Sequence, residues 1–436
     1  MKKEEELLKI KKELDELIDS IKVDKNKVDI NDNNTNNENN NIPQMSKIFF
    51  DEEKNPIIYK EKTEEEKKLI DEIKKEEQIK KDETIEENEI KNKKRTRKDK
   101  KKKKSKKWVI TFSILDVIAI VCLFLMYGPI SYFRNLWVTS AMTTMTHKYL
   151  AYIFFNEEQV QEIMANNIVI EVEGNTNQDE IEFKEPEEEQ IVYSSPEEEQ
   201  VLKKDPGNDL YKVIDIEGSG YKGHLLVVYD ASKVQLVQSP SKAYGLTIEQ
   251  FVEKNNAVAG INAGGFSYKK STGYSPAGAL ILDGNIISTG VTSWGGGIIG
   301  FTHDNVLVLT KSTAQEAVEM GVRDAVSFGP FLIVNGVASQ FKGNGGYGIA
   351  PRTAIGQRKD GIVLMLVIDG RRPGHSLGVD MVELTNIMLK YGAYNASNLD
   401  GGGSSSIVVN GETLSVAGGS GYSGDRYLPN AWLVMP

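Results

Sequence analysis

The stretch Tyr-Asn-Ala-Ser-Asn-Leu-Asp-Gly-Gly-Gly-Ser-Ser-Ser-Ile-Val-Val, residues 394–409, places an acid, three glycines and three serines between two apolar runs. Residues 394–399 and 405–409 both predict short strands. Between them, Asp400 precedes the bare backbone of Gly401, Gly402 and Gly403, which can bring N–H groups close to an anion. A plain hairpin turn is the alternative, because Asp-Gly is also a frequent hairpin signal.

Strand-like runs separated by glycine-rich turns continue on both sides of this stretch, from about residue 208 to the end. Asp283-Gly284-Asn285 and Asp360-Gly361 are typical of hairpin turns. Further candidate strands are 211–216, 224–229, 234–238, 257–262, 279–282, 298–301, 306–309, 331–334, 353–357 and 362–368, and candidate helices are 247–255, 313–320 and 379–391. This pattern predicts an α+β domain with a mixed, mostly antiparallel β-sheet and a few packed helices.

Charge and hydropathy predict one membrane span before this domain. Residues 91–107 carry 13 basic residues and one acid, and the apolar stretch 108–133 follows at once, with aromatic residues at both ends. The positive-inside bias then places residues 1–107 in the cytoplasm and residues from about 134 onward outside, in a single-pass protein of the cell membrane. The basic block therefore faces the bilayer, and no nucleic-acid partner is expected. Asp116 is an expensive residue within such a span.

The remaining segments predict little packed structure. Leu7, Ile10, Leu14, Leu17 and Ile21 follow a heptad spacing, which would allow self-association as a marginal coiled coil or would suit a solvated helix. The Asn-rich run 31–41 and the Lys/Glu-rich stretch to about residue 90 predict a largely disordered tail, or a single charged helix for the latter.

The connector, residues 134–207, separates the expected span from residues 208–436. Its first part, 134–167, has helical character. Residues 151–207 hold 16 acids against 3 bases, and Pro-Glu-Glu-Glu-Gln occurs at both 186–190 and 196–200. Repeated proline and like charge predict an extended acidic stalk.

Five segments of residues 208–436 share one property: each places polar or charged side chains beside glycine at the end of an apolar strand. They are 260–266, 327–331, 350–356, 367–372 and 398–406. Strand ends hold side chains rigidly, and the loops that follow expose them. Together the five segments predict one polar site.

In these residues and their order, the chain resembles the phosphodiester glycosidase family, which includes the lysosomal uncovering enzyme and bacterial exopolysaccharide-associated proteins. The resemblance covers roughly residues 211–436, and its most specific pieces are Arg352-Thr353-Ala354, Asp369-Gly370-Arg371 and residues 398–404. Residues 425–431 are similar to the family's Arg-Pro-x-x-Asn-Ala ending, with Tyr427 in place of proline. A second departure is Gly265, where members often have phenylalanine.

The resemblance implies hydrolysis of a sugar-1-phosphodiester to a free sugar and a phosphomonoester. Such a site needs an anion clamp and a carboxylate near the anomeric carbon. We expect Arg352, Arg371 and Arg426, with the N–H groups of Gly401, Gly402, Gly403 and Ser404, to bind the phosphate. Thr353 and Asn262 complete the expected substrate-binding set. Asp400 is the first candidate for nucleophile or base, and Asp369 is the second.

The sequence allows several alternatives. The domain could bind or assemble polysaccharide without turnover, or it could cleave the P–O bond as a phosphodiesterase. Individual residues have simpler interpretations too: an arginine at a strand end can form a surface ion pair, Asn262 can cap a turn, and a solvated loop position is favoured for His375. No cofactor is expected, and a divalent ion between Asp369 and Asp400 is left undecided. Cys122 is the only cysteine, so an outer zinc–thiolate site is excluded.

Overall fold

The structure, a computed structural model, describes residues 64–144, 147–183, 192–290, 295–416 and 426–436. Its contacts divide the chain into two units, Met1–Ser105 and Lys106–Pro436, and each is described by itself. The N-terminal heptads, the Asn-rich run and the first Pro-Glu-Glu-Glu-Gln repeat lie outside the described residues. All sheets discussed below belong to the second unit.

Helix α2 (Glu64–Tyr127) includes most of the Lys/Glu-rich stretch. Of the two predictions for this stretch, a disordered tail or a single charged helix, the structure has the helix from residue 64 onward. Its last 20 residues, Trp108–Tyr127, are long and apolar enough to cross a membrane, by length and composition. The helix ends before residue 133 because Gly128 and Pro129 follow, and proline cannot continue the backbone hydrogen bonds. The Gly128 N–H still bonds to the carbonyl of Phe124 at 2.8 Å.

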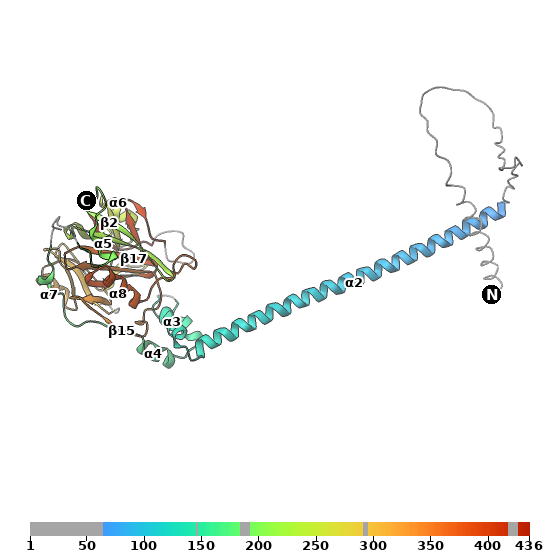
Figure 1. Ribbon diagram of the computed structural model, residues 1–436, viewed down its shortest axis with the longest axis horizontal. Coiled ribbons are helices and arrows are strands. Elements are labelled where there is room, and N and C mark those ends of the chain that lie inside the picture. The colour runs from blue at the N-terminus through green and yellow to red at the C-terminus, as the bar shows by residue number, and fades with distance from the viewer. Residues whose placement is uncertain (1–63, 145–146, 184–191, 291–294, 417–425) are drawn as a thin grey trace, which may run out of the picture. The chain divides into compact units, whose positions relative to one another are not determined.

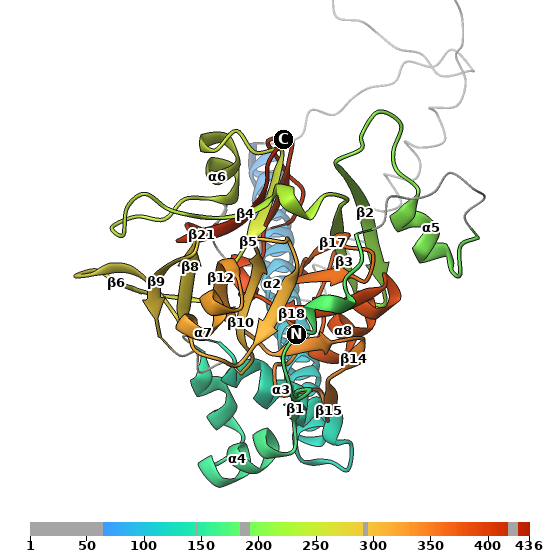
Figure 2. The same cartoon turned by 90° about the vertical axis from the view of Figure 1, so that its left-hand side faces the viewer.

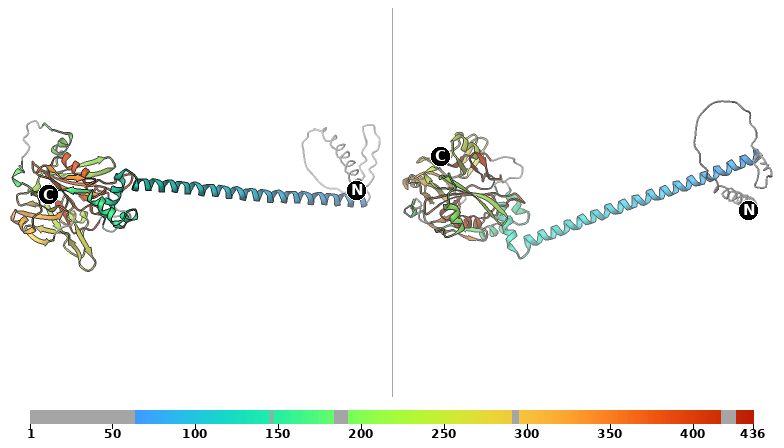
Figure 3. Two further views of the ribbon diagram at one scale, coloured as in Figure 1. Left: turned by 90° about the horizontal axis from the view of Figure 1, so that it is seen from below. Right: turned by 45° about the horizontal axis from the view of Figure 1, so that its top comes forward.

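Three short helices follow α2 and pack on one another: α3 (Ser131–Met142), the 3₁₀ helix η2 (Lys148–Ile153) and α4 (Glu157–Ala165). Their shared core includes Val138, Ala151 and Val160. A capping box between Asn156 and Gln159 begins α4. These helices lie together at one end of the domain (Figures 1, 2 and 3).

The rest of the connector, where it is described, is packed against the domain and is not an extended stalk. Strand β1 (Ile168–Ile170) pairs antiparallel with β15 (Gln340–Lys342). The hydroxyl of Thr176 accepts the Leu309 N–H at 2.9 Å. The second Pro-Glu-Glu-Glu-Gln repeat begins helix α5 (Pro196–Leu202), because Ser195 caps it and proline at the first helical position with glutamates behind it favours a helix start.

Three sheets form the body of the domain, and all their pairings are antiparallel. The seven-stranded sheet has the order β14 (Val337–Ala338), β13 (Phe331–Val334), β18 (Ala393–Asn398), β16 (Arg352–Arg358), β17 (Val363–Ile368), β3 (Tyr221–Val228), β2 (Tyr211–Gly218). The first five-stranded sheet has the order β11 (Leu307–Thr310), β10 (Gly297–Thr302), β12 (Val322–Phe328), β8 (Ala279–Leu282), β9 (Asn285–Thr289). The second has the order β20 (Glu412–Thr413), β19 (Ile407–Val409), β5 (Ala259–Asn262), β21 (Asn430–Val434), β4 (Val234–Gln238). A separate hairpin joins β6 (Phe266–Lys269) to β7 (Gly273–Pro276).

The main hydrophobic core lies between these sheets. It joins side chains of all three, such as Met365, Phe301 and Trp432, and all three are fully buried. A second core covers the other face of the seven-stranded sheet with α8 (Met381–Lys390), whose Leu384 and Met388 are buried. Two further α-helices of the described residues are α6 (Ile248–Lys254) and α7 (Ala314–Glu319). The expected α+β class with antiparallel sheets is confirmed.

Candidate active site

Three strand ends meet at one edge of the seven-stranded sheet. Arg352 begins β16 and pairs with Ile368 at the end of β17, while Ala354 pairs with Asn398 at the end of β18. Asp369 and Asp400 follow β17 and β18 respectively, and β16 lies between these strands. Two strand spacings put their backbones on the order of 10 Å apart.

Asn262 connects this edge to the second five-stranded sheet, because it ends β5. Its buried side chain donates to the Asp400 carbonyl at 2.5 Å and accepts from the Thr353 hydroxyl at 2.7 Å and the Ser406 N–H at 3.1 Å. All hydrogen-bonding groups of the amide except one N–H are therefore used inside the protein. Substrate binding by Asn262 and Thr353 stays a prediction, and in the structure their side chains fix the backbone that carries Asp400.

Asp400 is partly exposed, but the surrounding protein removes much of the water from around its carboxylate. Burial raises its pKa to about 6, although hydrogen bonds from the Ser404 hydroxyl and the Gly401 N–H, together with the charge of Arg426, oppose that rise. Arg426 reaches it through Ser404, since Nη1 of Arg426 donates to Oγ of Ser404 at 3.1 Å. At neutral pH, Asp400 is therefore mostly ionised and still basic enough to accept a proton.

Most N–H groups of the glycine loop, residues 398–406, donate hydrogen bonds to other groups of the protein. The N–H of Gly402 bonds to the Pro351 carbonyl at 2.9 Å, and the N–H of Ser404 bonds to the Gly401 carbonyl at 3.2 Å. The Gly401 N–H serves the Asp400 carboxylate. Among the described residues, the N–H of exposed Gly403 has no hydrogen-bond partner. The expected cradle of four N–H donors is therefore reduced to this one, because the loop closes into the 3₁₀ turn η5 (Gly402–Ser404).

The expected arginine clamp divides into two kinds of residue. Arg352 is buried, with Nε on the Val379 carbonyl at 3.2 Å and Nη2 on the Tyr347 and Gly348 carbonyls at 2.7 Å each. Burial lowers its pKa to about 10, and the nearby charge of Arg371 adds to the effect. Its main contacts thus hold the fold.

Arg371 is exposed, and its guanidinium makes no hydrogen bond or ion pair within the described residues. It lies against the glycine loop, since a side chain added at Gly402 would begin 3.4 Å from Nη1 of Arg371. Its backbone has a φ of 57°, a left-handed conformation that costs a non-glycine residue about 1–2 kcal/mol. Such strain is typical of functional positions. Partial desolvation lowers the pKa of Arg371.

Asp369 is buried and fully occupied. Its carboxylate contacts Nε2 of His375 at 2.7 Å and accepts the Val416 N–H at 2.9 Å. The Ser376 hydroxyl donates to the Asp369 carbonyl at 2.6 Å and so closes the loop between Asp369 and His375. The expectation of a solvated loop position for His375 is wrong, because the chain folds back over six residues and brings its partly exposed ring onto Asp369. The Arg-Pro-Gly turn before His375 was the only sequence signal.

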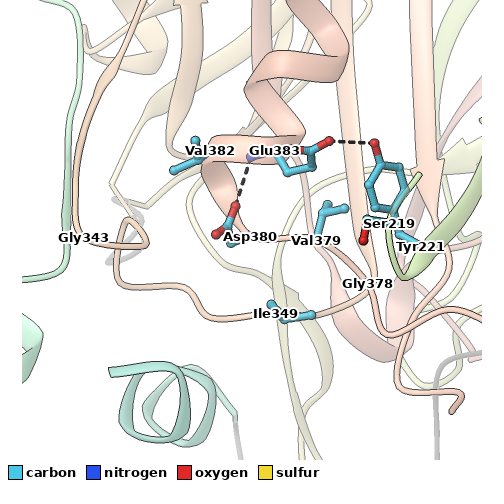
Figure 4. A pocket seen from close by; sticks show the side chains of 9 residues that line it. All are labelled: Ser219, Tyr221, Gly343, Ile349, Gly378, Val379, Asp380, Val382 and Glu383. Carbon is cyan, nitrogen blue, oxygen red and sulfur yellow. Dashed lines mark hydrogen bonds between the residues drawn. The ribbon is translucent and has the colours of Figure 1, made fainter. Parts of the chain in front are cut away.

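A cavity of about 430 Å³ opens beside the start of α8, and Tyr221, Asp380 and Glu383 are among the residues lining it (Figure 4). The Tyr221 hydroxyl donates to Glu383 at 2.6 Å, and Asp380 caps α8 by accepting the Glu383 N–H at 3.0 Å. Neither Asp369 nor Asp400 lines the cavity, and its connection to the site is Val379, whose carbonyl accepts a hydrogen bond from Arg352. Among the described residues, no three His, Cys, Asp or Glu gather closely enough to hold a metal ion.

The structure thus brings together all five segments that the sequence singled out. The end of the 327–331 segment joins through Gly329, whose carbonyl accepts the Asn398 side-chain amide at 2.8 Å. Val416 was not singled out from the sequence, and it reaches the site through its N–H. Phe266, the last residue of segment 260–266, also reaches the site, because its ring centroid lies 4.8 Å from the guanidinium carbon of Arg426.

Comparison with known proteins gives one family. Residues 255–435 match the family model described as phosphodiester glycosidase. The N-acetylglucosamine-1-phosphodiester alpha-N-acetylglucosaminidase of Bos taurus is 29% identical over 136 residues, which are 31% of this chain and 21% of that protein. The protein of the same name from Mus musculus is 26% identical over 246 residues, 50% of this chain and 45% of that protein.

The chain therefore spans less than half the length of these two relatives. Among solved structures, the zebrafish N-acetylglucosamine-1-phosphodiester alpha-N-acetylglucosaminidase catalytic domain, auto-inhibited by its pro-peptide, is 19% identical with a TM-score of 0.44. That match covers 53% of this chain and 85% of the zebrafish chain.

Proposed function

We propose that this chain, whose residues 255–435 match the phosphodiester glycosidase family model, hydrolyses the glycosidic bond of a sugar-1-phosphodiester. The relatives are named for N-acetylglucosamine, and we take it as the first sugar to test. The observation that carries the proposal is a basic carboxylate, Asp400, on the glycine loop, with the guanidinium of Arg371, which is unpartnered among the described residues, lying against the same loop. The carboxylate suits the anomeric carbon, and the guanidinium suits the phosphate.

In the proposed reaction, the C1–O bond to the phosphate breaks, and its electron pair leaves with the phosphate oxygen. The oxygen of water becomes the anomeric hydroxyl of the free sugar, and the second proton of water passes to solvent. A phosphomonoester is a good leaving group, so the step depends less on a general acid than ordinary glycoside hydrolysis does. Asp400 either deprotonates the water directly or first attacks C1 as a nucleophile.

Arg371 and Arg426 are the proposed phosphate ligands, with the N–H of Gly403 as a backbone donor. Guanidinium groups match phosphate with forked, charge-assisted hydrogen bonds. Arg352 lies close enough to affect Arg371 electrostatically, so it adds positive potential while its own hydrogen bonds stay on carbonyls. Asp369 holds the ring of His375 at the edge of the site.

We further propose that Trp108–Tyr127 anchors the chain in the cell membrane, with the N-terminal part in the cytoplasm and the domain outside. The support is the apolar length of this helix and the basic block before it. An outward-facing domain would meet cell-envelope or exopolysaccharide phosphodiesters of a bacterium. Protease digestion of intact cells that carry a C-terminal tag tests this: loss of the tag is expected, and full protection would overturn the topology.

Hydrolysis itself is tested with the full chain in detergent micelles and the methyl phosphodiester of α-N-acetylglucosamine 1-phosphate. Release of reducing sugar and methyl phosphate is expected from the wild-type chain and not from Asp400→Asn. Binding without turnover by the wild-type chain would favour a polysaccharide-binding module. Equal turnover by both chains would remove Asp400 from the mechanism.

A further inference from the structure

One exposed aromatic surface adjoins the site and takes no part in the chemistry above. We call Phe266, Tyr268 and Tyr274 the aromatic hairpin face. In the β6–β7 hairpin Tyr268 lies directly opposite Tyr274, and Phe266 is two residues from Tyr268, so the three rings share one side of the hairpin. The ring centroids are 4.8 Å apart for Tyr268 and Tyr274, and 5.4 Å for Phe266 and Tyr274.

This face is open to solvent at its outer end. Tyr268 is 54% exposed, and β6 extends away from the sheets at the edge of the domain (Figure 2). Tyr427 is 53% exposed. Burial raises the pKa of Tyr274, and the nearby hydroxyls of Tyr268 and Tyr427 add to this rise, whereas the charge of Arg426 lowers the pKa. Tyr427 therefore lies close to Tyr274. Three tyrosines therefore gather around this hairpin, two of them more than half exposed.

Arg426 joins the face to the site. Its guanidinium carbon lies 4.8 Å from the Phe266 ring centroid, and its Nη1 donates to Oγ of Ser404, which bonds to Asp400. If Arg426 binds the phosphate, the reacting sugar would therefore lie on the side of the phosphate that faces Asp400. The group on the other ester oxygen of the phosphate would lie toward Tyr268 and Tyr274.

We propose that the aromatic hairpin face is a subsite for a second sugar, the one attached to the far side of the scissile phosphodiester. This deepens and rests on the proposed function, and it makes a phosphodiester-linked oligosaccharide the substrate class. Sugar rings present flat C–H faces that pack on aromatic rings, and a tyrosine hydroxyl at the rim can bond to sugar hydroxyls. Continuity with the phosphate ligand Arg426 favours a sugar over a lipid or a protein.

The kinetic test uses the full chain in micelles with two probes, an N-acetylglucosamine 1-phosphate tetramer linked through phosphodiesters and the methyl diester used above. The measured quantity is the ratio of kcat/KM for the tetramer to kcat/KM for the methyl diester. Tyr268→Ala should lower this ratio about 5- to 10-fold, the effect of one aromatic contact. Tyr268→Phe should keep it, because the ring remains.

Tyr149→Ala is the matched control, since Tyr149 is 61% exposed and belongs to η2, outside the site. Its ratio should equal that of the wild type. An unchanged ratio in Tyr268→Ala, or an equal fall in the Tyr149→Ala control, would overturn the subsite.

A binding test separates the subsite from the proposed reaction. Asp400→Asn, and the same chain with Tyr268→Ala added, are each titrated with the tetramer in micelles by isothermal titration calorimetry. A Kd that is about 5- to 10-fold weaker in the second chain supports the subsite even if the wild-type chain hydrolyses neither probe. Equal Kd values for both chains, or binding by neither, would overturn the subsite while leaving hydrolysis of the methyl diester a separate result.

Discussion

The loops after β17 and β18 start from the same sheet edge, and each contains an aspartate near its start. The surroundings of the two aspartates differ. Asp369 is buried and has both carboxylate oxygens bound, one by His375 and one by the Val416 N–H. Asp400 is partly exposed and is desolvated enough to have a pKa of about 6. A carboxylate with satisfied oxygens positions its neighbours, whereas a basic one that reaches solvent can react. The difference favours Asp400 as the proposed reacting carboxylate and Asp369 as a positioning residue, while Arg371 of the β17 loop stays a proposed phosphate ligand.

The largest expected effect is that of Asp400→Asn. An amide can neither attack C1 nor accept a proton, so kcat for the methyl diester should fall by about 10³-fold or more. Product release measured by reducing-sugar assay checks this. A fall of only a few-fold would mean that the two loops do not differ as proposed.

Thermal unfolding is the control for that variant. Because folding raises the pKa of Asp400 from 3.8 to about 6, the folded chain is relatively more stable below pH 4 and loses that stability as pH rises through about 6. Asp400→Asn removes the loss, so its Tm should exceed that of the wild type at pH 7 and approach it near pH 4. A lower Tm at pH 7 would show that the carboxylate supports the fold.

The next largest effects are expected from Arg371 and Arg352, whose alanine variants should lose different properties. Arg371→Ala should raise KM for the methyl diester about 100-fold, the loss of one charge-assisted clamp, and leave KM for neutral p-nitrophenyl N-acetylglucosaminide nearly unchanged. Arg352→Ala should instead lower Tm, since the carbonyls of Tyr347, Gly348 and Val379 each lose a hydrogen bond from the guanidinium. Equal KM losses for charged and neutral substrates in Arg371→Ala would argue against a phosphate ligand.

Asp369 and His375 should behave as one unit with a smaller effect. Asp369→Asn and His375→Ala should each lower kcat about tenfold, and the double variant should be no worse than either, because coupled residues are not additive. KM should change little, which a purely structural loss of the loop would not produce. Multiplied losses in the double variant would show that the two act independently.

The smallest expected effect is a shift in pH dependence. The rate should rise with pH through about 6 as Asp400 ionises, and Arg426→Gln should move that midpoint upward, because the Arg426 charge opposes the raised pKa. Ser404→Ala should move it in the same direction. A midpoint that moves downward in either variant would contradict the network that connects Arg426 to Asp400.

Sequence patterns were sufficient for the sheet strands with strong apolar runs and for the five polar segments. They missed β12, which contains Arg323 and Asp324, and β21, whose start Asn430 follows a proline, because polar or proline-bounded runs weaken the strand signal. They also assigned the second Pro-Glu-Glu-Glu-Gln repeat to a stalk, where Ser195 begins a helix.

Within the site, local sequence identified the residues but not their partners. The glycine loop indicated N–H donors, yet only tertiary contact with Pro351 decides that the Gly402 N–H is already taken. Arg352 and Arg371 look alike in sequence, and burial against three carbonyls separates them. His375 depends on a loop closing onto Asp369, which no periodicity predicts.

The central claim concerns which bond breaks, and oxygen-18 water tests it most directly. Cleavage at C1–O and cleavage at P–O give the same two products from the methyl diester, and they differ only in where the water oxygen goes. Mass spectrometry after a single turnover by the full chain should find the label in N-acetylglucosamine. Label in methyl phosphate would contradict the account and identify a phosphodiesterase.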